Sequence, residues 1–316
     1  MRIYMRKRDG YRFVRGGHVI DLQRGIAAGS PTPVSVDGVF GGQTETALKL
    51  WQSRNGLPVT GTVDQLTWQG ATNKPLPSQF RRCLAVTAAF EGHNYTFAAG
   101  NWDNAYLTWG VVGFTLKHGN FGKVIKRINQ RHPALLEAAM GHNKAAELLA
   151  ILSASAAEKK AWGNAISRLP TKYRLVDDWE DAFEVLGNQP EVRIIQDEVA
   201  YEVYWSRAVQ DLDTFGELTE ADAALFFDTA VQNGGVDSDK ATRIRNGLAA
   251  NPGASGRDRL AIIAEAIARG SNPDFYEDVL SRRMTIATGS GVVHGASYFL
   301  ADWAIDLVDI EAGDLA

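Results

Sequence analysis

The feature that most constrains the fold is a succession of helix-like segments that runs from residue 78 to the end of this 316-residue chain. Apolar residues recur in these segments at the spacing of one helix face. One stretch differs, because Tyr95, Thr96 and Phe97 favour a strand and a Gly-Asn turn follows them. We therefore expect a mostly α fold with a small β-hairpin near residues 95–106. The predicted helices span residues 78–91, 120–131, 144–156, 157–168, 179–187, 190–215, 219–234, 239–249, 257–268, 274–287 and 294–306.

A separate pattern of three shorter helices occupies the first part of the chain. Helical spacing covers residues 19–26 and 44–52, a short third helix is expected near residues 64–68, and glycine turns lie between them. Residues 73–78 contain two prolines and end with a serine suited to cap the next helix, which is typical of a short, stiff linker. We accordingly place one domain, with a basic N-terminal arm, at residues 1–73, a linker at 74–77 and a larger domain at 78–316.

The motifs of residues 18–72 resemble the small three-helix peptidoglycan-binding domain. Leu-Gln at 22–23 is followed by Asp-Gly-x-Phe-Gly from residue 37, by Trp-Gln at 51–52 and by Asp-x-x-Thr-Trp from residue 64. The resemblance implies that bacterial peptidoglycan is a partner, with Asp37, Phe40, Thr44 and Trp51 as candidate residues of the binding module. Packing in a small core is the favoured role of Phe40, whereas Asp37 and Thr44 could cap a loop or contact the ligand.

Two carboxylates lie in contrasting surroundings at the start of the larger domain. Glu91 ends an apolar helix-like run beside Phe90, and Gly92 is a natural helix stop. Asp103 follows in a polar turn that also contains Asn101 and Asn104. Apolar surroundings keep a carboxyl group protonated, whereas hydrogen bonds keep one ionised. Cleavage of a glycosidic bond requires such a pair, although a solvated charge and a turn cap are the alternative reading of these two residues.

This segment resembles the catalytic segment of family 46 chitosanases and related lysozyme-like glycosidases. The resemblance rests on Glu91, on Asp103 with Tyr106 and Thr108, and on Gly-Val-Val-Gly-Phe at 110–114. It implies a lysozyme-like α+β domain with Glu91 as general acid, Asp103 as base or electrostatic partner, and Thr108 placing the attacking water. The other candidates bind substrate: Trp102, Tyr106 and Trp109 by stacking on sugar rings, and Asp228, Gln232 and Asn233 from a weaker match over residues 192–234. A buried structural role for Asp228 and helix capping for the two amides stay open.

The sequence departs from the chitosanase pattern in the turn that carries Asp103. That turn reads Asp-Asn-Ala where the family has glycines, and Trp109 occupies a position that is usually small. The segments expected to line the cleft are also not notably acidic, although a cationic polymer such as chitosan needs several carboxylates. Together with the wall-binding module, these features favour peptidoglycan, and the combination resembles modular endolysins of phages that infect Gram-negative bacteria. We predict hydrolysis of the β-1,4 bond between N-acetylmuramic acid and N-acetylglucosamine, with a lytic transglycosylase, a chitosanase or a non-catalytic wall-binding protein as alternatives.

Composition narrows the remaining classes of function. A net charge of −4 gives no support for a nucleic-acid partner. The six histidines are scattered without an HExxH pair, and Cys83 stands alone in an apolar run, so we expect no metal, no cofactor and no thiol catalysis. Cys83 reads as a buried small hydrophobe. No apolar run approaches the ~20 residues of a membrane span, so we expect no stable membrane insertion, and we expect a monomer.

The two ends of the chain carry opposite charge. The first eighteen residues are basic and lack the apolar segment of a signal peptide, which predicts synthesis in the host cytoplasm and later release to the cell wall in the periplasm. Both ends could be solvated, or the basic arm could attach to an anionic cell envelope. The acidic C-terminal residues are Asp302, Asp306, Asp309, Glu311 and Asp314.

Overall fold

The computed structural model describes residues 2–28, 30–310 and 315. It consists of two compact units, of which unit 1 contains residues 1–90 and 204–316 and unit 2 contains residues 91–203. The fold is mostly helical, as the sequence predicts, with short strands that form small sheets. Within the described residues, no helix is both long and apolar enough to cross a membrane.

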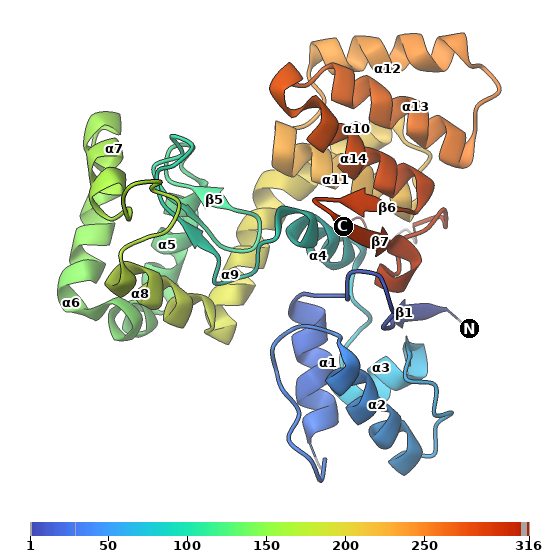
Figure 1. The fold of residues 1–316 in the computed structure, drawn as a ribbon, viewed down its shortest axis with the longest axis horizontal. Coiled ribbons are helices and arrows are strands. Elements are labelled where there is room, and N and C mark those ends of the chain that lie inside the picture. The colour runs from blue at the N-terminus through green and yellow to red at the C-terminus, as the bar shows by residue number, and fades with distance from the viewer. Residues whose placement is uncertain (1, 29, 311–314, 316) are drawn as a thin grey trace. The chain divides into compact units, whose positions relative to one another are not determined.

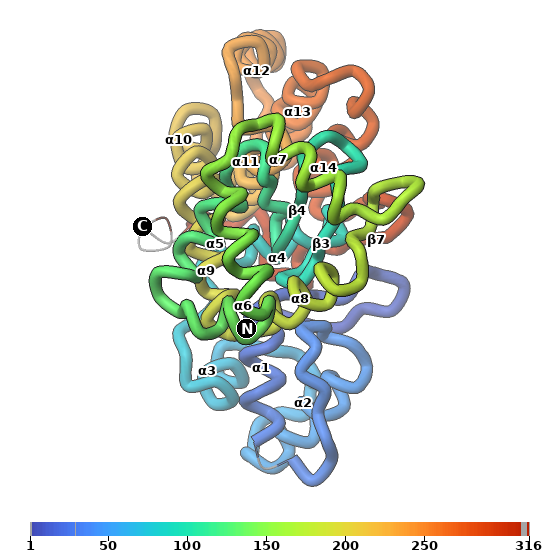
Figure 2. The backbone as a smooth tube through the Cα atoms, turned by 90° about the vertical axis from the view of Figure 1, so that its left-hand side faces the viewer, coloured from blue at the N-terminus to red at the C-terminus, as the bar shows by residue number. Residues whose placement is uncertain are grey.

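Unit 1 begins with the predicted three-helix module. Helices α1 (Gly17–Ala27), α2 (Gly42–Arg54) and α3 (Gln65–Thr72) lie together, as Figures 1 and 2 show. Two buried glutamines explain the Leu-Gln and Trp-Gln motifs. Gln23 donates to Thr44 Oγ1 at 3.0 Å and accepts from the Gly38 backbone at 2.8 Å, and Gln52 accepts from the Gly61 backbone at 2.9 Å. Each glutamine thereby ties a glycine turn to a helix, because a buried amide needs partners for its polar atoms.

The basic N-terminal arm is part of unit 1. Strand β1 (Ile3–Met5) pairs antiparallel with β2 (Val63–Asp64) of the module. Arg6 and Arg8 both contact the buried carboxylate of Asp302, and Arg2 contacts Glu220. These three arginines have acidic partners within the protein, so this part of the arm is not a freely solvated terminus, and its attachment to the cell envelope stays a prediction. Glu311 and Asp314 lie outside the described residues.

The rest of unit 1 is a helical core. The side chains of α4 (Gln79–Glu91) are buried from Gln79 to Phe90, apart from Arg81, and the Phe80 ring meets Trp205 and Phe227 edge-on. Because α4 is enclosed on all sides, it is apolar around most of its circumference. The other helices of this core are α10 (Ser206–Phe215), α11 (Glu220–Asn233), α12 (Ser238–Ala250), α13 (Gly256–Arg269) and α14 (Tyr276–Thr288), with the 3-10 turn η2 (Pro273–Phe275) before α14 (Figure 1).

The helix predicted over residues 294–306 is wrong. The structure has a hairpin of β6 (Ser290–Val293) and β7 (Ala296–Phe299), followed by the 3-10 turn η3 (Leu300–Trp303). His294 and Gly295 form the turn of the hairpin, with φ angles of +49° and +76°. A right-handed helix excludes such angles. The spacing that suggested a helix comes from buried residues of a strand and a 3-10 turn, Tyr298, Leu300 and Trp303.

Unit 2 combines a small sheet with helices. Strands β3 (Ala98–Ala99), β4 (Thr108–Trp109) and β5 (Phe114–Thr115) pair antiparallel in that order. The small sheet therefore lies further along the chain than the predicted hairpin, because residues 95–97 are not in a strand and residues 101–106 form bends between β3 and β4. The ring of Trp109 contacts those of Phe121 and Phe183 in the core of this unit. The helices are α5 (Asn120–Arg131), α6 (Pro133–Ile151), α7 (Ala156–Ala165), α8 (Asp177–Gly187) and α9 (Pro190–Ala200).

Two helices of this region differ from their predicted bounds. Helix α6 begins at Pro133, since proline suits the first turn of a helix, and it is kinked at Gly141, whose φ is +71°. The predicted helix corresponds to the part of α6 after this kink, and the part before it was not predicted. The single helix predicted over residues 190–215 is interrupted by the π-helical segment η1 (Tyr201–Trp205), which separates α9 from α10. Of the two boundaries between the units, the second falls inside η1.

Candidate active site

Glu91 is the last residue of α4 and is partly exposed. The residue before it, Phe90, is 1% exposed, so the helix that carries Glu91 is anchored in apolar surroundings up to the preceding residue. Gly92 has a φ of +70° and ends the helix, as predicted. A rigid helix end therefore presents this carboxyl group, which is the placement a general acid requires.

Asp103 lies in an exposed turn, and its Oδ1 accepts a hydrogen bond from the backbone N–H of Ala105 at 3.0 Å. The buried Asn101 holds this turn by accepting from the Tyr106 backbone and donating to Asn164 Oδ1, both at 2.9 Å. Asn101 thus orders the backbone around Asp103. The result is a solvent-facing carboxylate on a fixed turn, in contrast to the position of Glu91.

The three candidate aromatic residues occupy different environments. Trp102 is 55% exposed and meets the ring of Tyr173 edge-on, with centroids 5.7 Å apart. Trp109 is 0% exposed, so its ring has no free face for a sugar; this corrects the expectation that it stacks on substrate. Tyr106 is also buried, with a φ of +71° in the turn before β4. Trp102 is therefore the candidate whose ring is accessible for stacking.

Tyr173 is a residue that the sequence analysis missed. It is 47% exposed, and its contact with Trp102 forms an exposed aromatic pair within unit 2. The backbone carbonyl of Tyr173 accepts from the N–H of Gly100 at 2.8 Å, which joins its loop to the turn of Asp103. A Cβ at Gly100 would lie 2.5 Å from the carbonyl oxygen of Lys172, so this approach requires glycine. The sequence signal that could have identified Tyr173 is an aromatic residue in an otherwise polar loop.

Thr108 lies in β4 between Ala99 and Thr115 and is 8% exposed. The Gly-Val-Val-Gly turn that follows is held by the fully buried Gln196 of α9, which accepts from the Val111 backbone at 2.9 Å and donates to the Tyr95 carbonyl at 3.0 Å. A Cβ at Gly110 would meet Gln196 Oε1 at 2.4 Å, which explains the first glycine of that motif. Gln196 therefore connects the segment before β3 to the turn after β4, the strand that carries Thr108.

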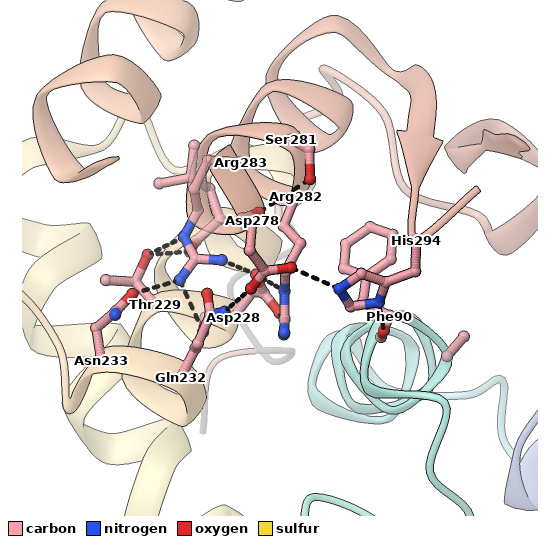
Figure 3. Close-up of polar contacts among 12 residues, drawn as sticks. Phe90, Asp228, Thr229, Gln232, Asn233, Asp278, Ser281, Arg282, Arg283 and His294 are labelled. Atoms are coloured by element: carbon pink, nitrogen blue, oxygen red, sulfur yellow. Dashed lines mark hydrogen bonds and ion pairs between the residues drawn. The ribbon is translucent and has the colours of Figure 1, made fainter. Parts of the chain in front are cut away.

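Asp228 is part of a buried ionic network in unit 1. Its side chain is 0% exposed and accepts from Arg282 Nη2 at 2.5 Å and from Arg282 Nε at 3.2 Å, and it also pairs with Arg283 (Figure 3). Arg283 additionally donates to Thr229 Oγ1 at 2.9 Å. Burial without access to solvent corrects Asp228 as a substrate-binding residue and supports the structural alternative, in which its carboxylate pairs with two arginines of α14.

Gln232 and Asn233 also have partners on α14. Gln232 Nε2 donates to Asp278 Oδ2 at 2.5 Å, and Asn233 Oδ1 accepts from Arg283 at 2.8 Å. Gly234, with a φ of +71°, caps the C-terminus of α11. Both amides therefore hold α11 against α14 in this structure, while each side chain stays partly exposed (Figure 3).

In the three-helix module, the structure separates packing residues from a surface pocket. Phe40 is 0% and Thr44 3% exposed, and Asp37 is an exposed loop residue that accepts from Gln23 and from the Val39 backbone. The favoured packing role of Phe40 is consistent with this burial. Trp51 lines a pocket of about 240 Å³ between α1 and α2, together with Ile26, Ala28, Ser30, Ala47, Leu50, Arg54 and Asn55.

Cys83, His93 and possible metal ligands are the remaining candidates for chemistry. Cys83 is fully buried, and desolvation raises the pKa of its thiol to about 12, which fits the role of a small hydrophobe. His93 stacks on Phe97 with ring centroids 3.8 Å apart. Among the described residues, no group of three or more His, Cys, Asp and Glu side chains is arranged to hold a metal ion.

The module matches a known family. Residues 15–69 match the family model described as putative peptidoglycan binding domain. No curated protein matches the chain in sequence. Together with the fold described next, this defines a modular protein in which a peptidoglycan-binding domain is joined to a lysozyme-like helical fold.

Solved structures identify that fold more closely. The native chitosanase from Bacillus subtilis MY002 is 19% identical and has a TM-score of 0.51, and the match covers 71% of this chain and 99% of the chitosanase. A GH46 chitosanase from Gynuella sunshinyii, solved with chitotetraose, is 17% identical with a TM-score of 0.48 over 72% of this chain and 99% of its own. The chain is thus similar in fold to a chitosanase over most of its length.

Proposed function

We propose that this protein is a glycoside hydrolase that cleaves the glycan strands of bacterial peptidoglycan, at the β-1,4 bond between N-acetylmuramic acid and N-acetylglucosamine. The observation that carries the proposal is the pair of carboxyl groups in unit 2. Glu91 ends a helix buried in apolar surroundings, and Asp103 lies on an ordered, solvent-facing turn. In the proposed reaction Glu91 protonates the leaving oxygen, and Asp103 activates water or supports positive charge on the sugar.

Two features support a polysaccharide substrate with a peptidoglycan backbone. The exposed rings of Trp102 and Tyr173 provide an apolar surface beside the turn of Asp103, on which sugar rings can stack. The peptidoglycan-binding module in the same chain would hold the enzyme on the cell wall. In the module, the pocket beside Trp51 combines an apolar wall with Arg54, which suits a peptide that carries small side chains and a carboxylate.

Chitosan is the second candidate substrate. The similarity in fold to the chitosanase from Bacillus subtilis MY002 favours it. A chitosanase must balance the positive charge of a deacetylated polymer, so the two hypotheses differ in whether N-acetylated or free amino sugars are bound. A lytic transglycosylase would act on the same bond as a muramidase but would leave anhydro-muramyl ends.

The proposal is tested with purified sacculi and soluble chitosan, using the wild-type protein and the Glu91→Gln variant. We expect the wild type to release reducing muramic acid ends from sacculi, as measured by mass spectrometry. Glu91→Gln should lower kcat by about 10²–10⁴-fold, the range that general acid catalysis contributes. The matched control is Glu184→Gln, which changes an exposed glutamate on α8 of the same unit and should leave kcat unchanged.

Each outcome of this experiment distinguishes the proposed muramidase from one of the alternative functions. Anhydro-muramyl products would identify a transglycosylase, and turnover of chitosan alone would identify a chitosanase. Full activity of Glu91→Gln would remove the proposed mechanism. Because Glu91 lies outside the module, the variant should still co-sediment with sacculi; binding without turnover by the wild type would indicate a non-catalytic wall-binding protein.

A further inference from the structure

The turn of the β6–β7 hairpin contains an unusual residue for its conformation. Val293 pairs with Ala296, so His294 and Gly295 alone make the turn, and both have positive φ angles. Two-residue hairpin turns with two positive φ angles strongly favour Asn-Gly, because asparagine tolerates the left-handed region. Histidine also tolerates this region, but its longer side chain reaches partners outside the turn. Its presence therefore points to a role of the imidazole beyond the turn.

The imidazole bridges two helices of unit 1. Its Nδ1 lies 2.9 Å from the carbonyl oxygen of Phe90 in α4, and its Nε2 lies 2.5 Å from Asp278 Oδ1 in α14 (Figure 3). A carbonyl oxygen and an ionised carboxylate only accept hydrogen bonds. Each ring nitrogen therefore faces an oxygen acceptor, so the imidazole connects the Phe90 carbonyl to the Asp278 carboxyl group.

Asp278 is itself held in place. Its second oxygen, Oδ2, accepts from Gln232 of α11 at 2.5 Å. One turn further along α14, Arg282 pairs with the buried Asp228 and lies over the ring of Phe90, 5.7 Å from its centroid. Side chains from α11, α14 and the hairpin thus converge on the last turn of α4. The link formed by Gln232, Asp278 and His294 ends at the Phe90 carbonyl.

That carbonyl belongs to the peptide group that joins Phe90 to Glu91. In the last turn of a helix, carbonyl groups lack a partner within the helix, so a side chain that contacts one of them there supplies the missing partner. A hydrogen bond to the Phe90 oxygen therefore limits rotation of the peptide plane that carries the Glu91 backbone. We infer that His294 is a positioning residue, which through this bond sets the orientation of the Glu91 carboxyl group. The inference rests on the proposed role of Glu91 as general acid.

The test compares kcat and KM of His294→Asn with those of the wild type, on soluble glycan strands or, if that is what the wild type cleaves, on chitosan. Asparagine followed by glycine is the favoured pair for this turn, so the variant keeps the hairpin and removes the imidazole. We expect kcat to fall about 10- to 100-fold with KM within twofold, because misplacement of a reacting group lowers the rate of the chemical step. The midpoint of thermal unfolding should stay at or above that of the wild type.

Two further variants distinguish positioning from stability. Asp278→Asn removes the charged partner of the imidazole but keeps a side-chain oxygen, and it should lower kcat by a smaller factor. Val292→Thr changes a residue of β6 that is 57% exposed, and it should leave kcat and KM unchanged.

The outcomes also separate this inference from the proposed function. Wild-type activity of Glu91→Gln would contradict the proposed function and, with it, the basis for a positioning role of His294. If Glu91→Gln is inactive while His294→Asn keeps the wild-type kcat, the proposed function stands and the positioning role of His294 is overturned. A loss of thermal stability in His294→Asn would overturn it in favour of a structural role, and a rise in KM at constant kcat would overturn it in favour of a substrate contact.

Discussion

Two tryptophans near Asp103 look alike in sequence and have different surroundings in the structure. Trp102 is 55% exposed on the turn, whereas Trp109 is 0% exposed in a two-residue strand. An exposed ring adds little to folding but provides a flat face for a sugar, and a fully buried ring contributes mainly through packing. The difference gives a direct test of which residue contacts substrate.

We predict that Trp102→Ala raises KM for glycan strands about 3- to 10-fold, which corresponds to the roughly 0.5–1.5 kcal/mol of an aromatic contact. Its free energy of unfolding should stay within about 0.5 kcal/mol of the wild type. The paired variant Trp109→Ala should instead lose about 3–5 kcal/mol of stability. Steady-state kinetics and urea unfolding measure both quantities. An unchanged KM for Trp102→Ala would show that this ring does not bind substrate.

Part of the candidate site could be predicted residue by residue. Glu91 at a helix end and Gly92 as its terminator follow from local sequence, because capping depends on a few neighbouring residues. The burial of Trp109 could not be predicted, since strands of two residues are too short to show a periodic pattern. Tyr173 could not be placed beside Trp102 because loop closure, not sequence proximity, brings them together.

At the level of elements, α11 and α14 are joined by a buried ionic network. Asp228 faces two arginines of α14, all of them at most 1% exposed. Removal of one partner from such a network leaves a buried charge without compensation, which strongly destabilises the folded state. The intact network, by contrast, is often no more stable than apolar side chains of similar volume would be.

We therefore predict that Asp228→Asn lowers the free energy of unfolding by about 3–5 kcal/mol. Urea unfolding measured by circular dichroism gives this value. Asp213→Asn, on the exposed face of α10, serves as the control and should be neutral. A stable Asp228→Asn variant with weakened substrate binding would instead restore the substrate-binding role.

Elements differ in how well the sequence predicts them. Helices α4, α5 and α11 follow from their apolar spacing, α11 also begins with a capping box at Thr219, and α5 is found at its predicted bounds. The hairpin at β6 and β7 was mistaken for a helix because its turn uses histidine where the favoured residue would have signalled a hairpin. The π-helical segment η1 leaves no local signal, since inserting one residue per turn changes the backbone and not the composition.

At the level of the whole molecule, pH acts on stability through a buried histidine of the module. His18 on α1 is 5% exposed, and desolvation, followed by the positive charge of Arg81, lowers its pKa from 6.5 to about 4. The folded protein keeps this ring neutral, whereas the unfolded chain takes up a proton below pH 6.5. The unfolded state thus binds more protons between pH 4 and 6.5, and stability rises with pH in that interval.

We predict that the free energy of unfolding falls as the pH is lowered from 6.5 to 4, with a contribution of His18 of up to about 3 kcal/mol. In His18→Gln this part of the pH dependence should be absent. His142→Gln, at a histidine whose side chain is 84% exposed, is the control and should keep the wild-type curve. Identical slopes for His18→Gln and the wild type would show that the ring titrates normally in the folded state.

Unit 1 is discontinuous, because residues 1–90 and 204–316 build it and unit 2 lies between them in sequence. During translation, the acidic partners of the N-terminal arginines and the aromatic partners of Phe80 leave the ribosome only after all of residues 91–203. The apolar side chains of α4 therefore lack these native contacts in the nascent chain until the C-terminal segment has been synthesised. Unit 2 is contiguous and can fold during this interval, so synthesis of the C-terminal segment completes the structure that the N-terminal segment begins.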